Sequence, residues 1–212
     1  MLYVGVTYTG NSNHRSELPA VTSRSLEPEN LLEVANVSIV SGTQMFIDPF
    51  GSRKIREGYR VNYVYGFSSG GFSYFLTTQK RNTRSSSFHS REGHPSTVVR
   101  VCQNDPNYYS YTEVPIECSS QAFNYSLAKA AYLGKPGLDL ANDLGVNFTD
   151  DVLFVVMDGQ LGDLNAYSAL CIYSLKSIEK MFTRNIKRCF NGEGDTGLNF
   201  IWPPPTVHQD RA

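Results

Sequence analysis

The chain contains 212 residues, of which 41% are hydrophobic, with 19 Lys and Arg against 20 Asp and Glu. This length and apolar content are sufficient for one domain with a sizeable core, or for a piece of a larger domain. The formal net charge of −1 excludes a strong long-range attraction to nucleic acids, which are therefore not expected as partners.

Short β-strands joined by turns are predicted along the first half of the chain. Aromatic and turn-forming residues are frequent, with 13 Tyr, 12 Phe, 17 Gly and 10 Pro, which suits such strands. The opening segment MLYVGVTYTG has neither the basic start nor the cleavage site of a signal peptide, so Met1 is interpreted as an internal start. Strands are predicted over residues 2–9, 19–26, 34–40, 44–47, 59–65 and 72–79, with a glycine-rich turn over residues 66–71.

Residues 97–118, TVVRVCQNDPNYYSYTEVPIEC, carry the clearest local pattern. Val98, Val99 and Val101 favour a first strand, since valine has a high β-strand propensity. Turn-forming residues follow at 104–107, and a second strand comes after them. The polar, Ser-rich residues 80–95 before this stretch are predicted to be an exposed loop. Three tyrosines of the turn are interpreted as exposed residues for cross-strand packing or protein contact: Tyr108, Tyr109 and Tyr111.

The second half of the chain is predicted to mix strands with short helical segments. Residues 123–133 suit either a strand or a helix, and Lys135-Pro136-Gly137 ends that element by turn chemistry. A short helical turn is expected at residues 138–145, an inner strand covered on both faces at 151–157, a further strand at 168–173, and a helix at 175–184. From Trp202 to the end, residues 202–212 are predicted to be an unstructured tail.

These elements predict an all-β fold with a short helix after the strand Ser168–Tyr173. Strand–turn units recur every 10 to 20 residues or so, which suits the blades of a β-propeller, although a β-sandwich would give a similar pattern. No run of about 18 apolar residues is present, so no transmembrane helix is predicted.

The motifs that could carry catalysis favour structural interpretations instead. Gly66-Phe67-Ser68-Ser69-Gly70 matches the G-x-S-x-G nucleophile elbow, but the elbow requires a helix after Ser68 and residues 71–79 are β-rich. Asp150 and Asp151 are adjacent, so on a strand they point to opposite faces and mark a polar strand start. No catalytic residue, cofactor or small-molecule substrate is expected.

Four cysteines leave two hypotheses open. Cys102, Cys118, Cys171 and Cys189 form no C-x-x-C pair and the four histidines are scattered, so a metal site is not expected. Either the cysteines are free thiols of an intracellular protein, or they form disulfides. Three glycosylation sequons favour a secreted or cell-surface protein; their acceptors are Asn36, Asn124 and Asn147.

Several segments resemble, in order, parts of the sema domain of plexins, which is a seven-bladed β-propeller. They are SYFLTTQ (73–79), RVCQNDPNYYSYTEVPIEC (100–118), AAYLGKPGLDLA with DDVLFVVM (130–141, 150–157), and ALCIYSLKSIEKMF with RCFNGEG (169–182, 188–194). Residues 2–26 resemble an earlier blade more loosely. The resemblance implies a partial propeller over residues 1–201, with a non-matching tail at 202–212.

The resemblance also implies a function and a covalent framework. It implies the extracellular part of a plasma-membrane receptor that binds semaphorin, with a receptor homodimer or a co-receptor as a further possible partner. It implies a bridge between Cys118 and Cys171, and it places the partners of Cys102 and Cys189 beyond Ala212. The chain is accordingly interpreted as several blades of a propeller, truncated at both ends and poorly stable alone. The residues that contact the ligand are not assigned.

Two alternatives stand beside a plexin. Met-type receptor tyrosine kinases share the fold, but they carry a basic processing site where this chain has only Ser119 to Ala122. A β-propeller hydrolase or intracellular scaffold is the second alternative, and it predicts reduced cysteines and unmodified asparagines.

Overall fold

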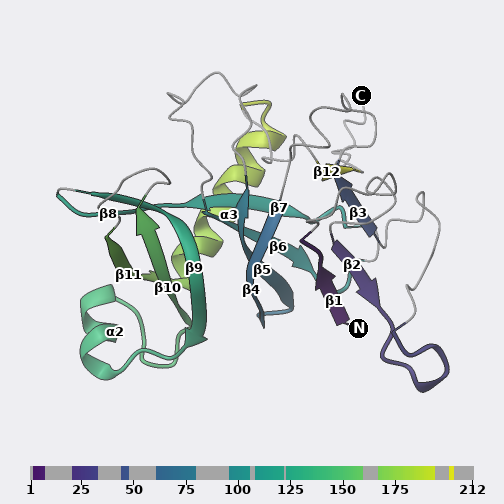
Figure 1. Ribbon diagram of the computed structural model, residues 1–212, viewed down its shortest axis with the longest axis horizontal. Helices are drawn as coiled ribbons and strands as arrows, with labels where there is room; N and C mark the ends of the chain where they lie inside the picture. The colour runs from purple at the N-terminus through teal and green to yellow at the C-terminus, as the bar shows by residue number, and fades with distance from the viewer. Residues whose placement is uncertain are drawn as a thin grey trace.

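The computed structural model describes residues 2–7, 21–32, 44–47, 61–79, 96–105, 108–121, 123–159, 167–193 and 201–202. These residues form three four-stranded antiparallel sheets, arranged in a row in Figure 1. The first sheet has the order β1-β2-β3-β12, the second β4-β5-β6-β7, and the third β11-β10-β9-β8. The strands are β1 (Leu2–Gly5), β2 (Val21–Arg24), β3 (Gln44–Ile47), β4 (Val61–Ser69), β5 (Phe72–Gln79), β6 (Ser96–Cys102), β7 (Thr112–Ile116), β8 (Cys118–Ser119), β9 (Asn124–Gly134), β10 (Val152–Gly159), β11 (Ser168–Ser174) and β12 (Ile201–Trp202).

The second sheet is a meander that starts from a tight hairpin. Gly70 and Gly71 form the two-residue turn between β4 and β5, both with positive φ (57° and 81°), as such turns require. The predicted turn at residues 66–71 is therefore too long, because β4 continues through Ser69. Ser68 lies within a β-hairpin, and the helix that a nucleophile elbow needs is replaced by β5.

The second sheet is buried on both faces because its side chains alternate between two cores. Tyr74, Leu76 and Val98 point into a core that they share with the third sheet and the helix α3 (Leu175–Phe190). Phe75 and Val99, one residue along, point into a second core shared with the first sheet. This alternation explains why nearly every residue of β5 and β6 is buried, including polar ones such as Thr77. It also stacks the three sheets face to face.

The predicted strand positions are largely confirmed. The structure places β3 and β5 at the predicted bounds, and β1 pairs with β2 as the returning strand. The segment left open between strand and helix is the strand β9, which pairs with β10 on one side and β8 on the other. The expected strand at residues 34–40 and the expected loop at residues 80–95 lie outside the described residues.

The helical turn expected at residues 138–145 is confirmed, whereas the helix that follows β11 is longer than the short one predicted for an all-β fold. The described residues contain a 3₁₀ turn, η2 (Pro28–Asn30), and two α-helices, α2 (Leu138–Leu144) and α3. The α3 helix has 16 residues and extends past the predicted end at Arg184. Phe182 completes its buried face with Leu175 and Ile178, and Met181 is only partly buried. The fold is mostly β with two helices.

Two further predictions are wrong at particular residues. Trp202 was assigned to the unstructured tail, but it pairs with Phe46 as part of β12, so that tail does not begin there. Residues 203–212 lie outside the described residues. Tyr108 and Tyr111 are each only 1% exposed, because the first sheet covers them, and only Tyr109 is exposed as predicted.

A buried carboxyl lies on the face of β7 that packs toward the first sheet. Glu113 accepts hydrogen bonds from the side-chain amide of Gln79 and from the hydroxyl of Tyr111. Burial raises the pKa of Glu113 to about 7, although both hydrogen bonds act in the opposite direction. The raised pKa indicates that this carboxyl is protonated in the folded chain at mildly acidic pH.

Glu113 is therefore expected to make folding stability fall as the pH rises from about 4.5 to about 7. In that range the unfolded chain has lost the proton that the folded chain retains. The loss amounts to about 3 kcal/mol at most, since one pKa unit corresponds to about 1.4 kcal/mol. Urea unfolding of the chain and of Glu113→Gln between pH 4.5 and 7.5 isolates this contribution as the difference between the two curves. A constant difference across the range would contradict it.

Candidate interaction surfaces

The outer face of the third sheet exposes large apolar side chains. The inward face of β10 carries Leu153 and Val155, both fully buried. On the opposite face, Val156 is 40% exposed, its partner Leu170 on β11 is 62% exposed, and Tyr132 on β9 is 65% exposed. A cluster of this kind on one sheet face is typical of a surface that another element or molecule covers.

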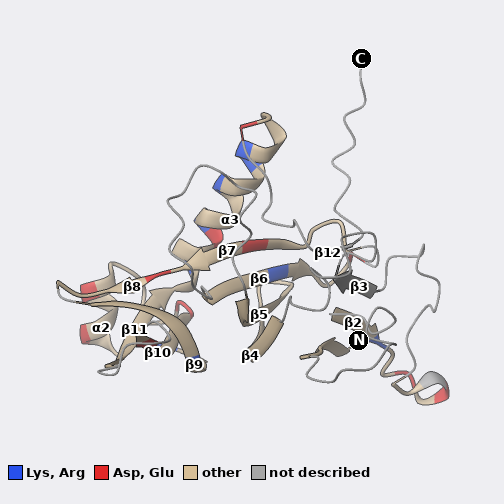
Figure 2. Cartoon of the chain, turned by 45° about the horizontal axis from the view of Figure 1, so that its top comes forward, with Lys and Arg blue, Asp and Glu red and all other residues tan. Residues whose placement is uncertain are grey.

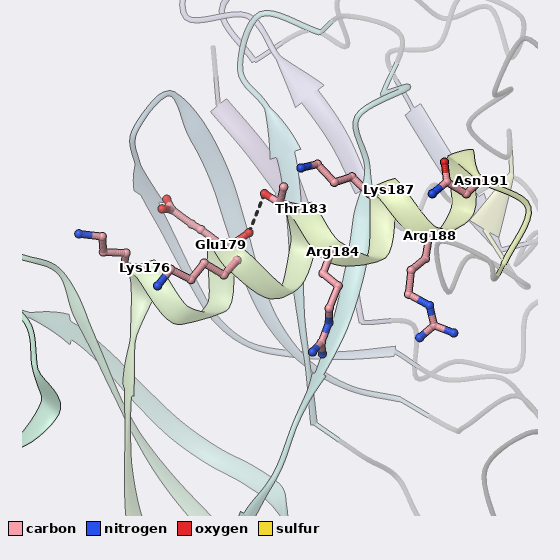
Figure 3. Close-up of a pocket in the computed structure, with 8 residues that line it drawn as sticks. Lys176, Glu179, Thr183, Arg184, Lys187, Arg188 and Asn191 are labelled. Atoms are coloured by element: carbon pink, nitrogen blue, oxygen red, sulfur yellow. Dashed lines mark hydrogen bonds between the residues drawn. The ribbon is translucent and has the colours of Figure 1, made fainter.

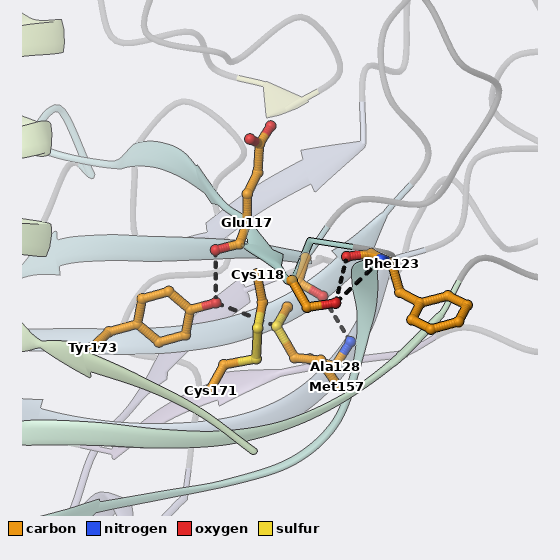
Figure 4. The surroundings of a disulfide bond; sticks show 9 residues. Glu117, Cys118, Phe123, Ala128, Met157, Cys171 and Tyr173 are labelled. Carbon is orange, nitrogen blue, oxygen red and sulfur yellow. Dashed lines mark hydrogen bonds between the residues drawn. A yellow bond between two sulfur atoms is a disulfide. The ribbon is translucent and has the colours of Figure 1, made fainter. Parts of the chain in front are cut away.

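A disulfide joins the first and last strands of the third sheet. Cys118 of β8 and Cys171 of β11 are bonded, with their Cα atoms 6.2 Å apart (Figure 4). The two outer strands come together because β9 curves strongly, with irregular register against β10 after Val156 and after Asp158. This is the pairing that the family resemblance implies.

A hydrogen-bonded tyrosine lies beside the disulfide. The Tyr173 hydroxyl donates to the Glu117 carbonyl at 3.0 Å and lies 3.3 Å from the Met157 sulfur (Figure 4). Burial, with a smaller effect of the Glu117 charge, raises the pKa of Tyr173 to about 12. The hydroxyl therefore stays protonated and able to donate at neutral pH.

Polar contacts join the second and third sheets at their edges. The Asp151 carboxylate accepts from Lys135 Nζ at 2.6 Å and from Ser69 Oγ at 2.7 Å, and these bonds lower its pKa. Asp150 instead accepts from the Asn147 N–H at 3.0 Å. The two adjacent carboxylates thus have separate structural partners, in agreement with their interpretation as a polar strand start.

The predicted sequons and free cysteines lie at accessible positions where they are described. Asn124 is exposed at the start of β9, and Asn147 is exposed in the loop before β10, whereas Asn36 lies outside the described residues. Cys102 and Cys189 are both free and partly exposed. These positions are compatible with sugar attachment and with further disulfides.

A row of cations on α3 was not identified from the sequence. Lys176, Lys180, Arg184, Lys187 and Arg188, here called the basic stripe, are all exposed and line a shallow groove of about 590 Å³ (Figures 2 and 3). Part of the signal was available, because Lys176, Lys180 and Arg184 recur every four residues within the predicted helix, whereas Arg188 lies beyond its predicted end.

The chain is similar to known proteins in both sequence and structure. No protein-family model matches the chain. Plexin-A2 of Homo sapiens is 31% identical over 209 residues, which cover 94% of this chain, and Plexin-A4 of Homo sapiens is 40% identical over 157 residues, which cover 72%. The chain belongs to the plexin family. Its plexin relatives are far longer, since the chain spans 11% of Plexin-A2 and 8% of Plexin-A4.

Solved plexin structures locate the similarity within the extracellular region. The full extracellular region of plexin A4 superposes with a TM-score of 0.74 and 33% identity, covering 91% of this chain and 21% of that one. Drosophila Plexin A in complex with Semaphorin 1b gives a TM-score of only 0.45 at 16% identity, and this similarity carries no argument. Membership of the plexin family argues against the Met-type, hydrolase and scaffold alternatives.

No helix among the described residues is long and apolar enough to cross a membrane. Among the same residues, no three His, Cys, Asp or Glu side chains gather in a group that could hold a metal ion.

Proposed function

We propose that this chain is part of the extracellular ligand-binding module of a plexin-type receptor. The carrying observation is the similarity to the plexin A4 extracellular region, which covers 91% of the chain. Residues 1–201 contribute several blades of a sema-type, seven-bladed propeller, and residues 203–212 stay outside it. The face-to-face stacking of four-stranded sheets supports this architecture. The exposed Tyr132, Val156 and Leu170 also support it, because a further blade would cover them.

The proposed ligand is a semaphorin, bound by a rigid scaffold that displays loops. Such a module works by recognition, without catalysis, a cofactor or a small-molecule substrate. Association into a receptor homodimer or with a co-receptor is compatible with the same role. The proposed module lies at the cell surface, outside the membrane.

The covalent features fit an extracellular module. The Cys118–Cys171 bridge staples the third sheet. Cys102 and Cys189 are proposed to pair with cysteines beyond residue 212, and Asn36, Asn124 and Asn147 are proposed to carry glycans. Oxidising conditions and glycosylation both belong to the secretory pathway.

A chimera tests the proposed function. The chain replaces its homologous segment in the Plexin-A4 extracellular region of Homo sapiens, and the secreted protein is measured against a panel of semaphorin ectodomains by surface plasmon resonance. The parental Plexin-A4 region serves as the positive control. We expect the chimera to be secreted as a monomer and to bind at least one semaphorin of the panel. A monomeric, folded chimera that binds none, while the parental region binds, would refute semaphorin recognition by this module.

A further inference from the structure

The α3 helix is strongly amphipathic, with its apolar side buried and its basic side in solvent. Leu175, Ile178 and Phe182 recur at helical spacing and are each at most 3% exposed. At 100° per residue, the basic stripe occupies a sector of about 120° on the side opposite Phe182. The stripe is therefore presented outward by a helix whose other side is fixed in the core.

The charge of the stripe is largely uncompensated. The helix carries five cations and one acid, Glu179, so its net charge is +4, whereas the whole chain has −1. The carboxylate of Glu179 accepts a hydrogen bond from the Tyr74 hydroxyl at 3.3 Å, which directs it toward the second sheet. Within the described part of the chain, no cation of the stripe forms a salt bridge, and Arg188 donates only to the Glu193 carbonyl. The five cations are available to a ligand.

The shape of the stripe is long and narrow. Lys176 and Arg188 are 12 residues apart, which corresponds to about 18 Å along the helix axis. Beside the five cations, the groove is lined by Thr183, Asn191 and one acid, Glu179. A row of cations without an apolar centre is unlike the core of a typical protein–protein interface. It is complementary to a flexible, linear polyanion.

We propose that the basic stripe binds a linear sulfated polysaccharide of the heparan sulfate type. Its sulfates and carboxylates recur along the polymer, so they match cations that recur along a helix, and binding releases condensed counterions. Anionic phospholipids are another kind of polyanion, but they concentrate in the cytoplasmic leaflet of the membrane. The matching region of plexin A4 is extracellular, so such lipids are a less suitable ligand. The inference rests on the extracellular location in the proposed function, but not on semaphorin binding.

The test compares two variants of equal net charge on the full 212-residue chain, secreted from mammalian cells. Lys180→Gln with Arg184→Gln removes two cations of the stripe, and Lys129→Gln with Lys135→Gln removes two exposed cations from the third sheet and its turn. Far-ultraviolet circular dichroism and urea midpoints check that both variants fold. Binding to a size-defined heparin oligosaccharide is measured by titration at several NaCl concentrations.

We expect the stripe variant to bind heparin about 10-fold more weakly or worse, because each cation near a polyanion contributes about fivefold. The control variant should change affinity less than about twofold, and the salt dependence should become shallower only in the stripe variant. Equal losses in the two variants, or no binding of the unmodified chain near 150 mM NaCl, would overturn the proposal. Stronger binding to phosphatidylserine vesicles or to polyglutamate than to heparin would also overturn it, in favour of a lipid or acidic protein partner.

Discussion

Replacing Phe182 with alanine is expected to destabilise the chain by about 3–5 kcal/mol, a large part of the stability of a typical domain. The Phe182 ring is fully buried where α3 meets the second and third sheets. It also stacks on the Arg100 guanidinium, 4.6 Å from the ring centroid, while Phe72 covers that cation from 4.3 Å. Alanine leaves a cavity and removes one of the two aromatic faces that hold Arg100.

The matched control is Phe190→Ala on the same helix. Phe190 is 75% exposed, so its removal should change the free energy of unfolding by less than about 0.5 kcal/mol. Urea unfolding followed by circular dichroism measures both variants, with the midpoint as the comparison. Equal midpoints for the two variants would show that α3 does not pack on the sheets as described.

Removing the Cys118–Cys171 bridge is expected to destabilise the chain by about 4 kcal/mol and to reduce its secretion sharply. The bridge closes a loop of 53 residues, and the entropy of an open loop that long favours the unfolded chain. The bridge also links β8 to β11, the two outer strands of the third sheet. The inner face of that sheet packs into the core that it shares with the second sheet and α3. The measurement is the yield and urea midpoint of Cys118→Ala with Cys171→Ala, secreted from mammalian cells.

Cys102→Ser with Cys189→Ser is the control for this experiment. Both thiols are free and partly exposed, so their removal should leave the midpoint nearly unchanged. It should also reduce any disulfide-linked oligomers on non-reducing gels, because the exposed thiols are then gone. If both double variants lost the same stability, the bridge would have no special role in the fold.

Local sequence patterns predict most strands because the determinants are local. β5 lies between a two-glycine turn and a polar segment, and its β-branched and aromatic residues leave no alternative to a strand. The apolar run of β10 likewise predicts a strand, but the expected covering of both faces is wrong, because Leu153 and Val155 are buried whereas Val156 is 40% exposed. The segment at β9 stayed ambiguous because its side chains suit both periods, and only its pairing with β10 and β8 decides.

Features that depend on distant contacts could not be predicted. Trp202 pairs with a strand more than 150 residues earlier, and nothing around it signals that partner. Tyr108 is buried against Val21 and Tyr3 of the first sheet, whereas its local sequence suggests exposure. Glu113 is likewise buried, although a carboxyl is usually exposed.

The buried face of α3 ends at Phe182, whereas Ile186 and Phe190 continue the four-residue apolar spacing in exposed positions. Lys187 and Arg188 lie in the last turn, where cations are favourable.

The interaction surfaces were predicted only in part. The resemblance to plexins implied the Cys118–Cys171 disulfide, whereas the spacing of the four cysteines alone did not show which of them pair. Tyr132, Val156 and Leu170 share one exposed sheet face because of the register in which β9, β10 and β11 pair. The sequence alone does not reveal that register. The basic stripe was recognisable from its four-residue spacing once the helix was known to reach Phe190.

Peptide mass spectrometry of the secreted chain tests the central claim, an extracellular plexin-type module, most directly. Non-reducing digestion should yield a peptide pair linked through Cys118 and Cys171, with glycans on Asn124 and Asn147, which are exposed, and on Asn36. Enzymatic removal of the glycans should convert each occupied asparagine to aspartate, which marks the site. A folded, secreted product with free Cys118 and Cys171 and unmodified asparagines would contradict the account.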